Sequence, residues 1–212
     1  MKVTVYFDPS CPFSWITSRW LLQVSGHREI DVVWRPFPLA FKNDEVESKD
    51  GESAHAQDHR DGLRALRVLM AAQRLHGTSL LDGYSASGMV RHIVGDALDD
   101  DGLRSMLTDY LHLPDTLLAA ADDTSHDTEL KASLDEALAV VRDDVGVPIL
   151  IFTPQDGPQQ GYFGPVLNEL PEIEESLSIW DGLVKLATVK SFYELKRTRP
   201  AGSPNTASTA KC

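Results

Sequence analysis

Cys11 is the residue of this sequence best suited to covalent chemistry, and Ser14 stands three positions after it in the stretch Cys-Pro-Phe-Ser. A strand pattern ends just before Cys11 and a helical pattern follows it. Pro12 suits the first turn of a helix, where its missing N–H costs nothing. Free N–H groups and the helix dipole favour an anion at that position. The sequence therefore predicts a solvent-accessible thiolate at neutral pH.

Ser14 determines what this thiol can do. Its hydroxyl can donate a hydrogen bond to the sulfur and so stabilise the charged form. A second cysteine there would permit an intramolecular disulfide, which a serine cannot form. A mixed disulfide at Cys11 must therefore be resolved by an outside thiol, for which a low-molecular-weight thiol is the natural candidate.

Pro148 is the second element of the expected site. It lies at the start of an apolar run of strand length, Val147 to Phe152, where a proline is normally disfavoured. A cis Val147–Pro148 bond would explain it, with a trans proline at the first strand position as the alternative. We expect this loop to face Cys11, so that the Val147 backbone can pair with a bound thiol compound.

A plainer interpretation makes Cys11 a small buried hydrophobic residue, as many free cysteines are. Its position between a strand and a helix, in Asp-Pro-Ser-Cys-Pro-Phe-Ser-Trp, weighs against that interpretation. The other cysteine, Cys212, is the last residue and is interpreted as incidental.

The elements around this motif predict an α/β fold with a thioredoxin-like core and a large helical insertion. Alternating and apolar runs predict strands at 3–7, 30–39, 147–152 and 161–166. Helices are expected from Cys11 or Pro12 to Val24 and over 172–195. Helices are also predicted over most of the chain between the second and third strands.

The expected domain organisation follows from this order. Residues 1–39 and 146–197 form a thioredoxin-like domain, and residues 40–145 form a helical insertion domain. Residues 198–212 are small and polar, so we expect a flexible, disordered tail.

The net negative charge of the chain limits which partners are expected. The chain has 212 residues and a net charge of −12, which argues against nucleic acid and anionic membranes as partners. It holds no apolar run of about 18 residues that would span a bilayer. The N-terminal stretch enters a strand pattern directly and lacks a secretory signal, so we expect a cytoplasmic protein.

Several residues give weaker signals. Trp15 and Asn43 are candidates for lining the thiol-binding site, together with Pro12 and Phe13. His55 and His59 have the spacing of metal ligands on a helix, but no third ligand is evident, so no metal is expected.

A basic cluster stands out in this acidic chain, formed by Lys196, Arg197 and Arg199. One interpretation places these cations at a helix C-terminus, where the dipole favours them. The other makes them part of a pocket for the thiol cofactor or the substrate.

Four stretches together resemble one known family: FDPSCPFSWITSRW, VGVPILIF, YFGPV and FYELKRTR. They are similar to the DsbA-like branch of the thioredoxin superfamily, which includes kappa-class glutathione transferases and 2-hydroxychromene-2-carboxylate isomerases. Within that branch the sequence most resembles the actinobacterial, mycothiol-dependent group, which includes a nitroreductase. The similarity extends over nearly the whole chain.

The resemblance assigns roles to four residues. Cys11 matches the nucleophile of that group, Phe13 the intervening aromatic residue and Pro148 the cis-proline. Ser14 stands where members usually have the second cysteine, which argues against dithiol oxidase or reductase activity. The serine is compatible with a natural monothiol enzyme or with an engineered Cys→Ser variant. The resemblance implies mycothiol rather than glutathione as the cofactor thiol.

Three functions remain open at this point. The first is a thiol–disulfide oxidoreductase in which Cys11 forms a mixed disulfide with a small thiol or a protein substrate. The second is a transferase or isomerase of the kappa type that binds a thiol cofactor without covalent attachment. The third is a redox-sensing or binding module, which a Cys11 pKa near the free value of about 8.5 would favour.

Overall fold

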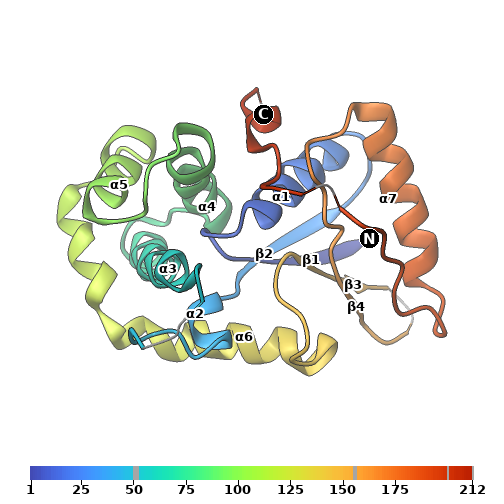
Figure 1. Cartoon of the computed structure of the whole chain (residues 1–212), viewed down its shortest axis with the longest axis horizontal. Coiled ribbons are helices and arrows are strands. Elements are labelled where there is room, and N and C mark those ends of the chain that lie inside the picture. Colours follow the sequence, from blue (N-terminus) through green and yellow to red (C-terminus); the bar gives the residue numbers. More distant parts are fainter. Residues whose placement is uncertain (50–52, 155–156, 200, 212) are drawn as a thin grey trace.

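The computed structural model describes residues 1–49, 53–154, 157–199 and 201–211. A mixed sheet with the strand order β2-β1-β3-β4 lies at its centre (Figure 1). β1 (Lys2–Phe7) runs parallel to β2 (Asp31–Pro36) and antiparallel to β3 (Ile149–Thr153). β4 (Gln160–Phe163) pairs antiparallel with β3 at one edge. The expected order of strands along the chain is confirmed.

Helices cover both faces of the sheet. α1 (Pro12–Ser25) and α7 (Ile173–Ala187) pack against one face, where Val3 and Val5 meet Trp20 and Trp180. α6 (Asp127–Val141) covers the other face, where Tyr6 and Ile149 lie among its apolar side chains. Successive strand residues point to opposite faces, which places β1 in both cores.

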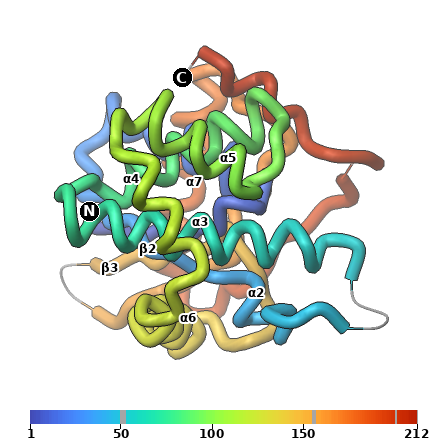
Figure 2. Tube along the Cα trace, turned by 90° about the vertical axis from the view of Figure 1, so that its left-hand side faces the viewer, coloured from blue at the N-terminus to red at the C-terminus, as the bar shows by residue number. Residues whose placement is uncertain are grey.

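The remaining helices stand together at one side of the sheet (Figures 1 and 2). They are α2 (Leu39–Lys42), α3 (Ala56–His76), α4 (Leu80–Gly88), α5 (Asp100–Ser105), the π-helical segments η1 (Met89–Val94) and η2 (Met106–Tyr110), and the 3₁₀ segments η3 (Asp115–Asp122) and η4 (Thr124–His126). They surround their own apolar core, to which Phe7 and Trp15 also belong. The first turn of α1 therefore lies between this helical part and the sheet.

The C-terminal part of the chain differs from the prediction in two ways. The last helix ends at Ala187 rather than near residue 195, because the following apolar side chains do not face the sheet: Tyr193 and Leu195 are more than four-fifths exposed. We call residues 188–199 and 201–211 the C-terminal segment.

The prediction of a disordered tail is wrong for much of this segment. Residues 206–209 form a 3₁₀ turn, η5 (Thr206–Thr209), that packs on α1 and η1, and Thr209 is buried. The Asn205 N–H donates to the Asn168 carbonyl at 2.7 Å, and Ser208 Oγ accepts from the Leu170 N–H at 2.8 Å. Polar groups hold this stretch in place, which a search for apolar side chains does not detect.

One finding bears on membranes. No helix among the described residues is both long enough and apolar enough to cross a bilayer.

Candidate active site at the start of α1

Cys11 caps the N-terminus of α1. Its backbone is extended, with φ −85° and ψ 113°, and Pro12 begins the helix, as the sequence predicts. The residue is partly exposed, and its thiol Sγ lies 3.5 Å from the carbonyl oxygen of Val147. The thiol thus donates a hydrogen bond to the loop that precedes β3.

The Val147–Pro148 peptide bond is cis, so this expectation is confirmed. A second cis bond joins Gly164 to Pro165 in the neighbouring turn, where the Gly164 N–H donates to the Pro148 carbonyl at 2.8 Å. Thr17 Oγ1 of α1 donates to the Pro165 carbonyl at 2.7 Å. The two proline turns are therefore fixed to each other and to the helix that Cys11 caps.

Ser14 lies in the first turn of α1 with only 1% of its surface exposed. Its Oγ finds no hydrogen-bond partner in the described part of the chain. Burial raises the pKa of the Cys11 thiol, and the backbone N–H and hydroxyl of Ser14, with the Phe13 N–H, oppose that shift without cancelling it. These three donors can stabilise a thiolate at Cys11, and the hydroxyl has no competing acceptor.

The predicted thiolate is nevertheless not the resting state that this structure favours. Burial raises the pKa of the Cys11 thiol above its ordinary value and outweighs the donors of Ser14 and Phe13. The negative charge of Asp8 raises this pKa further. The prediction from the helix N-terminus was wrong in sign, because it did not include the desolvation of a thiol that packs against an apolar cluster.

Asp8 is a polar residue of the site that the sequence did not reveal. It is fully buried, and its carboxylate accepts hydrogen bonds from the backbone and hydroxyl of Ser10 and from the Leu39 N–H, at 2.6–2.8 Å. Burial raises the pKa of this carboxyl, although those hydrogen bonds oppose the shift. A Cβ on Gly62 of α3 would lie 2.6 Å from Asp8 Oδ1, so α3 contacts this turn closely.

His92 of η1 reaches the same turn from the helical part. Its Nε2 donates to the Pro9 carbonyl at 2.9 Å, and its ring stacks on that of Trp15 with centroids 5.8 Å apart. Burial lowers the pKa of His92 to about 4. No motif in the sequence marks His92, which is an isolated histidine in a helical stretch.

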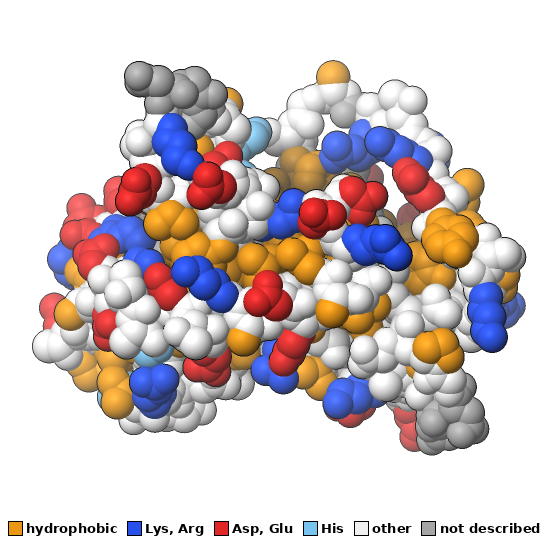
Figure 3. All heavy atoms as spheres, turned by 90° about the horizontal axis from the view of Figure 1, so that it is seen from below, with side chains coloured by type: hydrophobic (Ala, Val, Ile, Leu, Met, Phe, Trp, Pro, Cys, Tyr) orange, Lys and Arg blue, Asp and Glu red, His pale blue; other side chains and the backbone are white. Residues whose placement is uncertain are grey.

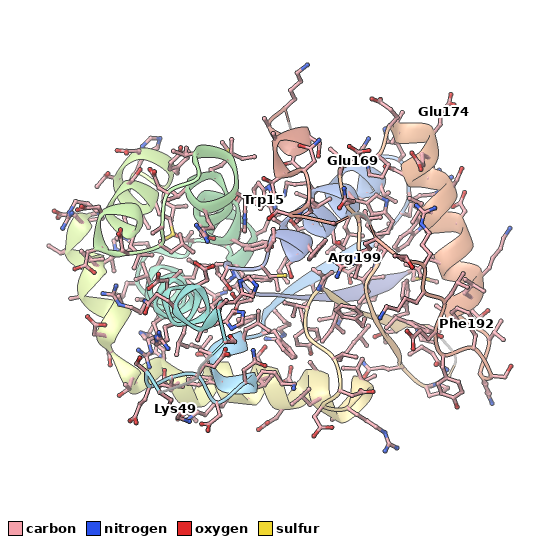
Figure 4. The ribbon with its side chains drawn as sticks, in the orientation of Figure 1. Trp15, Lys49, Glu169, Glu174, Phe192 and Arg199 are labelled. Carbon is pink, nitrogen blue, oxygen red and sulfur yellow. The ribbon has the colours of Figure 1, made fainter. Side chains whose placement is uncertain are left out.

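Trp15 is almost completely buried, which argues against the predicted direct contact with a ligand. Its ring packs against Gly88, where a Cβ would lie 2.1 Å from Trp15 Cζ3, and its Nε1 donates to Thr209 Oγ1 at 2.8 Å. In Figure 4 Trp15 lies between α4 and the C-terminal segment. Trp15 therefore joins the helical part, α1 and the C-terminal segment.

Phe13 lies in the middle of the motif, and the prediction that it contacts a ligand stays a prediction. It is partly exposed, and the guanidinium Cζ of Arg199 lies 4.5 Å from its ring centroid. The structure therefore brings one member of the basic cluster to the Cys-Pro-Phe-Ser motif. The interpretation of this cluster as helix-terminal cations is wrong for Arg199, since α7 ends at Ala187.

The other candidates lie further along the chain from this turn. Asn43 directs its amide to Glu45 and His59, and the prediction that it binds a ligand stays a prediction. His59 Nδ1 contacts Glu45 Oε2 at 2.5 Å, and the His55 ring lies 6.4 Å from that of His59. No group of three His, Cys, Asp or Glu side chains in the described ranges is arranged to hold a metal ion.

Comparison with solved structures defines the class of fold. The cytosolic disulfide reductase DsbM of Pseudomonas aeruginosa superposes with a TM-score of 0.54 at 14% identity, covering 88% of this chain and all of that one. A 2-hydroxychromene-2-carboxylate isomerase gives 0.56 at 14% identity, over 88% and 96%. A probable DsbA oxidoreductase of Streptomyces coelicolor, SCO1869, gives 0.53 at 19% identity, over 95% and 97%. At these identities the likeness shows the fold alone: a thioredoxin-like, DsbA-like fold with a helical insertion.

Sequence comparison identifies the family. Residues 10–197 match the model of the Rv2466c-like family, described as mycothiol-dependent nitroreductase Rv2466c. An uncharacterised protein of Mycobacterium tuberculosis, Rv2286c, is 32% identical over 200 residues, which cover 93% of this chain and 82% of that protein. The chain belongs to the Rv2466c-like family of the DsbA-like class.

The residues at Cys11 fit a thiol compound. Cys11 is partly exposed as a residue, an unpartnered buried hydroxyl lies beside its thiol, and the Val147 carbonyl can accept from an N–H group. A small thiol with an amide next to its sulfur would complement these groups.

Proposed function

We propose that this protein is a thiol–disulfide oxidoreductase that works through one cysteine, Cys11, and forms a mixed disulfide with a low-molecular-weight thiol. Membership of the Rv2466c-like family supports mycothiol as that thiol. The observation that carries the proposal is the placement of Cys11 Sγ at the cap of α1, beside Val147 and the unpartnered hydroxyl of Ser14.

The reaction balances without a metal or a second cysteine in the motif. The Cys11 thiol releases its proton to solvent, and the thiolate attacks a disulfide RSSR to give Cys11–S–SR and RS⁻. Cys11 is oxidised and the disulfide is reduced. The low-molecular-weight thiol R′SH then attacks the mixed disulfide, which regenerates Cys11 and releases RSSR′, so the net reaction is RSSR + R′SH → RSH + RSSR′. The same exchange with a protein disulfide is an alternative substrate for the first step.

Each nearby group has a role in this cycle. The Ser14 hydroxyl turns toward the sulfur once the proton has left, because the thiolate is then its acceptor. The Val147 carbonyl loses its donor when Cys11 has no hydrogen, and it becomes available to an amide N–H of the bound thiol compound. The loop thus aligns the compound for attack.

Intact mass spectrometry tests the proposal. The protein is exposed to oxidised mycothiol, and we expect one adduct per chain in a Cys212→Ser background and none in Cys11→Ala. Ser14→Cys is the matched gain-of-function variant, and it should convert the adduct into an internal disulfide between Cys11 and the introduced cysteine, with release of the thiol. The absence of any adduct at Cys11 would refute the proposal.

The raised pKa of Cys11 favours a second candidate of the kappa type. In it Cys11 and Ser14 hydrogen-bond the sulfur of a bound thiol cofactor, which itself attacks an electrophilic substrate. Turnover that survives Cys11→Ala but is lost in Ser14→Ala would support this candidate over the first.

A further inference from the structure

We infer that the C-terminal segment makes the Cys11 site selective for disulfides that carry negative charge, with Arg199 as the residue that determines this specificity. The inference deepens the proposed function and rests on it, since it concerns the substrate disulfide RSSR that Cys11 attacks and not the low-molecular-weight thiol R′SH that resolves the mixed disulfide.

Arg199 contacts the Cys-Pro-Phe-Ser motif from the C-terminal segment. Its guanidinium lies over the partly exposed ring of Phe13, within the range of a cation–π interaction, and the side chain remains exposed to solvent. Phe13 stands between Cys11 and Ser14, so a molecule bonded to Cys11 would pass close to this guanidinium. A guanidinium stacked through its face keeps its N–H groups free for a carboxylate.

The cations of the C-terminal segment are not neutralised locally. Residues 188–199 hold four cations and one carboxylate, in a chain with a net charge of −12. No carboxylate in the described part of the chain pairs with Lys196, Arg197 or Arg199. Arg67 and Arg91, by contrast, each lie 2.8 Å from an aspartate. The first turn of α1 also contains no acidic residue.

Contacts on both sides of Arg199 hold it in this position. Before it, the Phe192 carbonyl accepts from Tyr162 Oη at 3.4 Å, and the two rings are 6.1 Å apart. After it, Thr209 accepts from Trp15 Nε1 in a buried contact. The segment therefore touches both neighbours of Ser14, Phe13 through Arg199 and Trp15 through Thr209.

The surface beside this segment contains basic side chains. In Figure 3 several Lys and Arg side chains gather on the protrusion at the upper right of the view. Clustered cations attract anionic molecules and slow the approach of cationic ones.

The test uses three small disulfides of similar length and different charge: dithiodipropionic acid, bis(hydroxyethyl) disulfide and cystamine, which are anionic, neutral and cationic. The second-order rate of mixed-disulfide formation at Cys11 is measured by mass spectrometry in a Cys212→Ser background. We expect the unmodified site to react fastest with the anionic disulfide. Arg199→Gln should lower the ratio of the anionic to the cationic rate about tenfold, with little change for the neutral disulfide.

Two matched variants make the result specific. Arg199→Lys retains the charge and should keep most of the ratio. Arg74→Gln removes an exposed charge at the far end of α3, about 18 Å along the helix from Gly62, and should leave the ratio unchanged.

The outcomes distinguish a failure of the selectivity inference from a failure of the proposed function. If all three disulfides modify Cys11 and Arg199→Gln does not change the ratio, the selectivity inference is overturned while the proposed function stands. An equal fall of the ratio in Arg74→Gln would also overturn it, because the effect would then reflect net charge. If no disulfide modifies Cys11, the proposed function itself has failed.

Discussion

Two regions of the molecule hold the first turn of α1, and they do so in different ways. The helical part between β2 and β3 holds it by close packing of buried groups: Gly62 against Asp8, Gly88 against Trp15, and His92 on the Pro9 carbonyl. The C-terminal segment holds it through one buried hydrogen bond and one exposed guanidinium.

The difference assigns separate tasks to the two regions. The helical part packs closely on the residues before Cys11, and burial raises the pKa of the Cys11 thiol, so we expect this region to affect the chemistry of Cys11. The C-terminal segment contributes exposed charge at the rim and so affects which molecule arrives. Changes in the first region should alter stability and thiol pKa, whereas changes in the second should alter selectivity at little cost in stability.

The largest effect is expected from Gly88→Ala. A Cβ there would lie 2.1 Å from the Trp15 ring, which is buried and covered by Arg19 at 4.2 Å. We expect the free energy of unfolding to fall by about 3 kcal/mol, because the ring cannot withdraw without repacking the core. Urea denaturation followed by circular dichroism measures it.

Gly182→Ala is the matched control for that prediction. Gly182 also lies in a helix, α7, but no heavy atom lies within 4 Å of the position of an added Cβ. Alanine should stabilise the protein there by about 0.5–1 kcal/mol through helix propensity. A Gly88→Ala protein as stable as the parent would show that the packing of α4 on Trp15 does not fix the turn.

Asp8→Asn should have the next largest effect and lower the free energy of unfolding by about 2 kcal/mol. One carboxylate oxygen becomes an NH₂ group, which cannot accept from Leu39 or Ser10, and a buried donor is left unsatisfied. Removing the charge should also lower the pKa of Cys11, since the Asp8 carboxylate raises it.

The pH dependence of the rate of Cys11 alkylation measures the change in the thiol pKa. The midpoint should move to lower pH in Asp8→Asn. Ser10→Ala serves as the control, because it removes one hydrogen bond to Asp8 and keeps the charge. A midpoint that stays in place in Asp8→Asn would exclude Asp8 as a cause of the raised thiol pKa.

His92→Gln should reduce the loss of protein stability that occurs at acid pH. The folded protein binds a proton at His92 with a pKa of about 4, below the ordinary value of 6.5, so the unfolded chain binds more protons between these values. Stability must therefore fall as the pH decreases from 6.5 through 4. The full shift corresponds to about 3 kcal/mol, and the partial exposure of the ring reduces this to roughly 2 kcal/mol.

Glutamine keeps an N–H donor for the Pro9 carbonyl but does not titrate. The variant should therefore lose roughly 2 kcal/mol less between pH 6.5 and pH 4 than the parent does, as measured by denaturation at several pH values. His76→Gln, at an exposed histidine near the end of α3, should retain the parent's acid sensitivity. An unchanged pH dependence in His92→Gln would contradict the prediction.

Local patterns were enough to predict the parts of the site that depend on neighbouring residues in the chain. The start of α1 follows from the position of Pro12, and the cis Val147–Pro148 bond was one of the two alternatives that Pro148 allowed. The strand order along the chain follows from apolar periodicity. Each of these features depends on only a few consecutive residues.

The features that were missed depend on contacts across the chain. Burial raises the thiol pKa, and the apolar cluster against which Cys11 packs includes Leu134 and Val147, which are far from it in sequence. His92 reaches Pro9 across 83 positions. Thr209 contacts Trp15 across 194 positions, from a stretch too polar to signal any packing. A sequence pattern contains no measure of such burial, so the sign of the pKa shift could not be predicted from it.

The smallest effect on stability is expected from Thr209→Val, which has nearly the same shape but no hydroxyl. Trp15 Nε1 loses its acceptor, and we expect a cost of about 1 kcal/mol, because a short terminal segment can detach and let water reach the indole. Hydrogen exchange should become faster at residues 204–209 but not in α1.

The same variant should also change selectivity: its preference for dithiodipropionic acid over cystamine should fall partway toward that of Arg199→Gln, since Arg199 loses one of its two anchors. Thr188→Val removes an exposed hydroxyl that bonds only within the end of α7, and should change neither readout. If the charge preference survives Thr209→Val in full while residues 204–209 exchange freely, the Phe192 contact alone positions Arg199, and the two regions act independently on the turn.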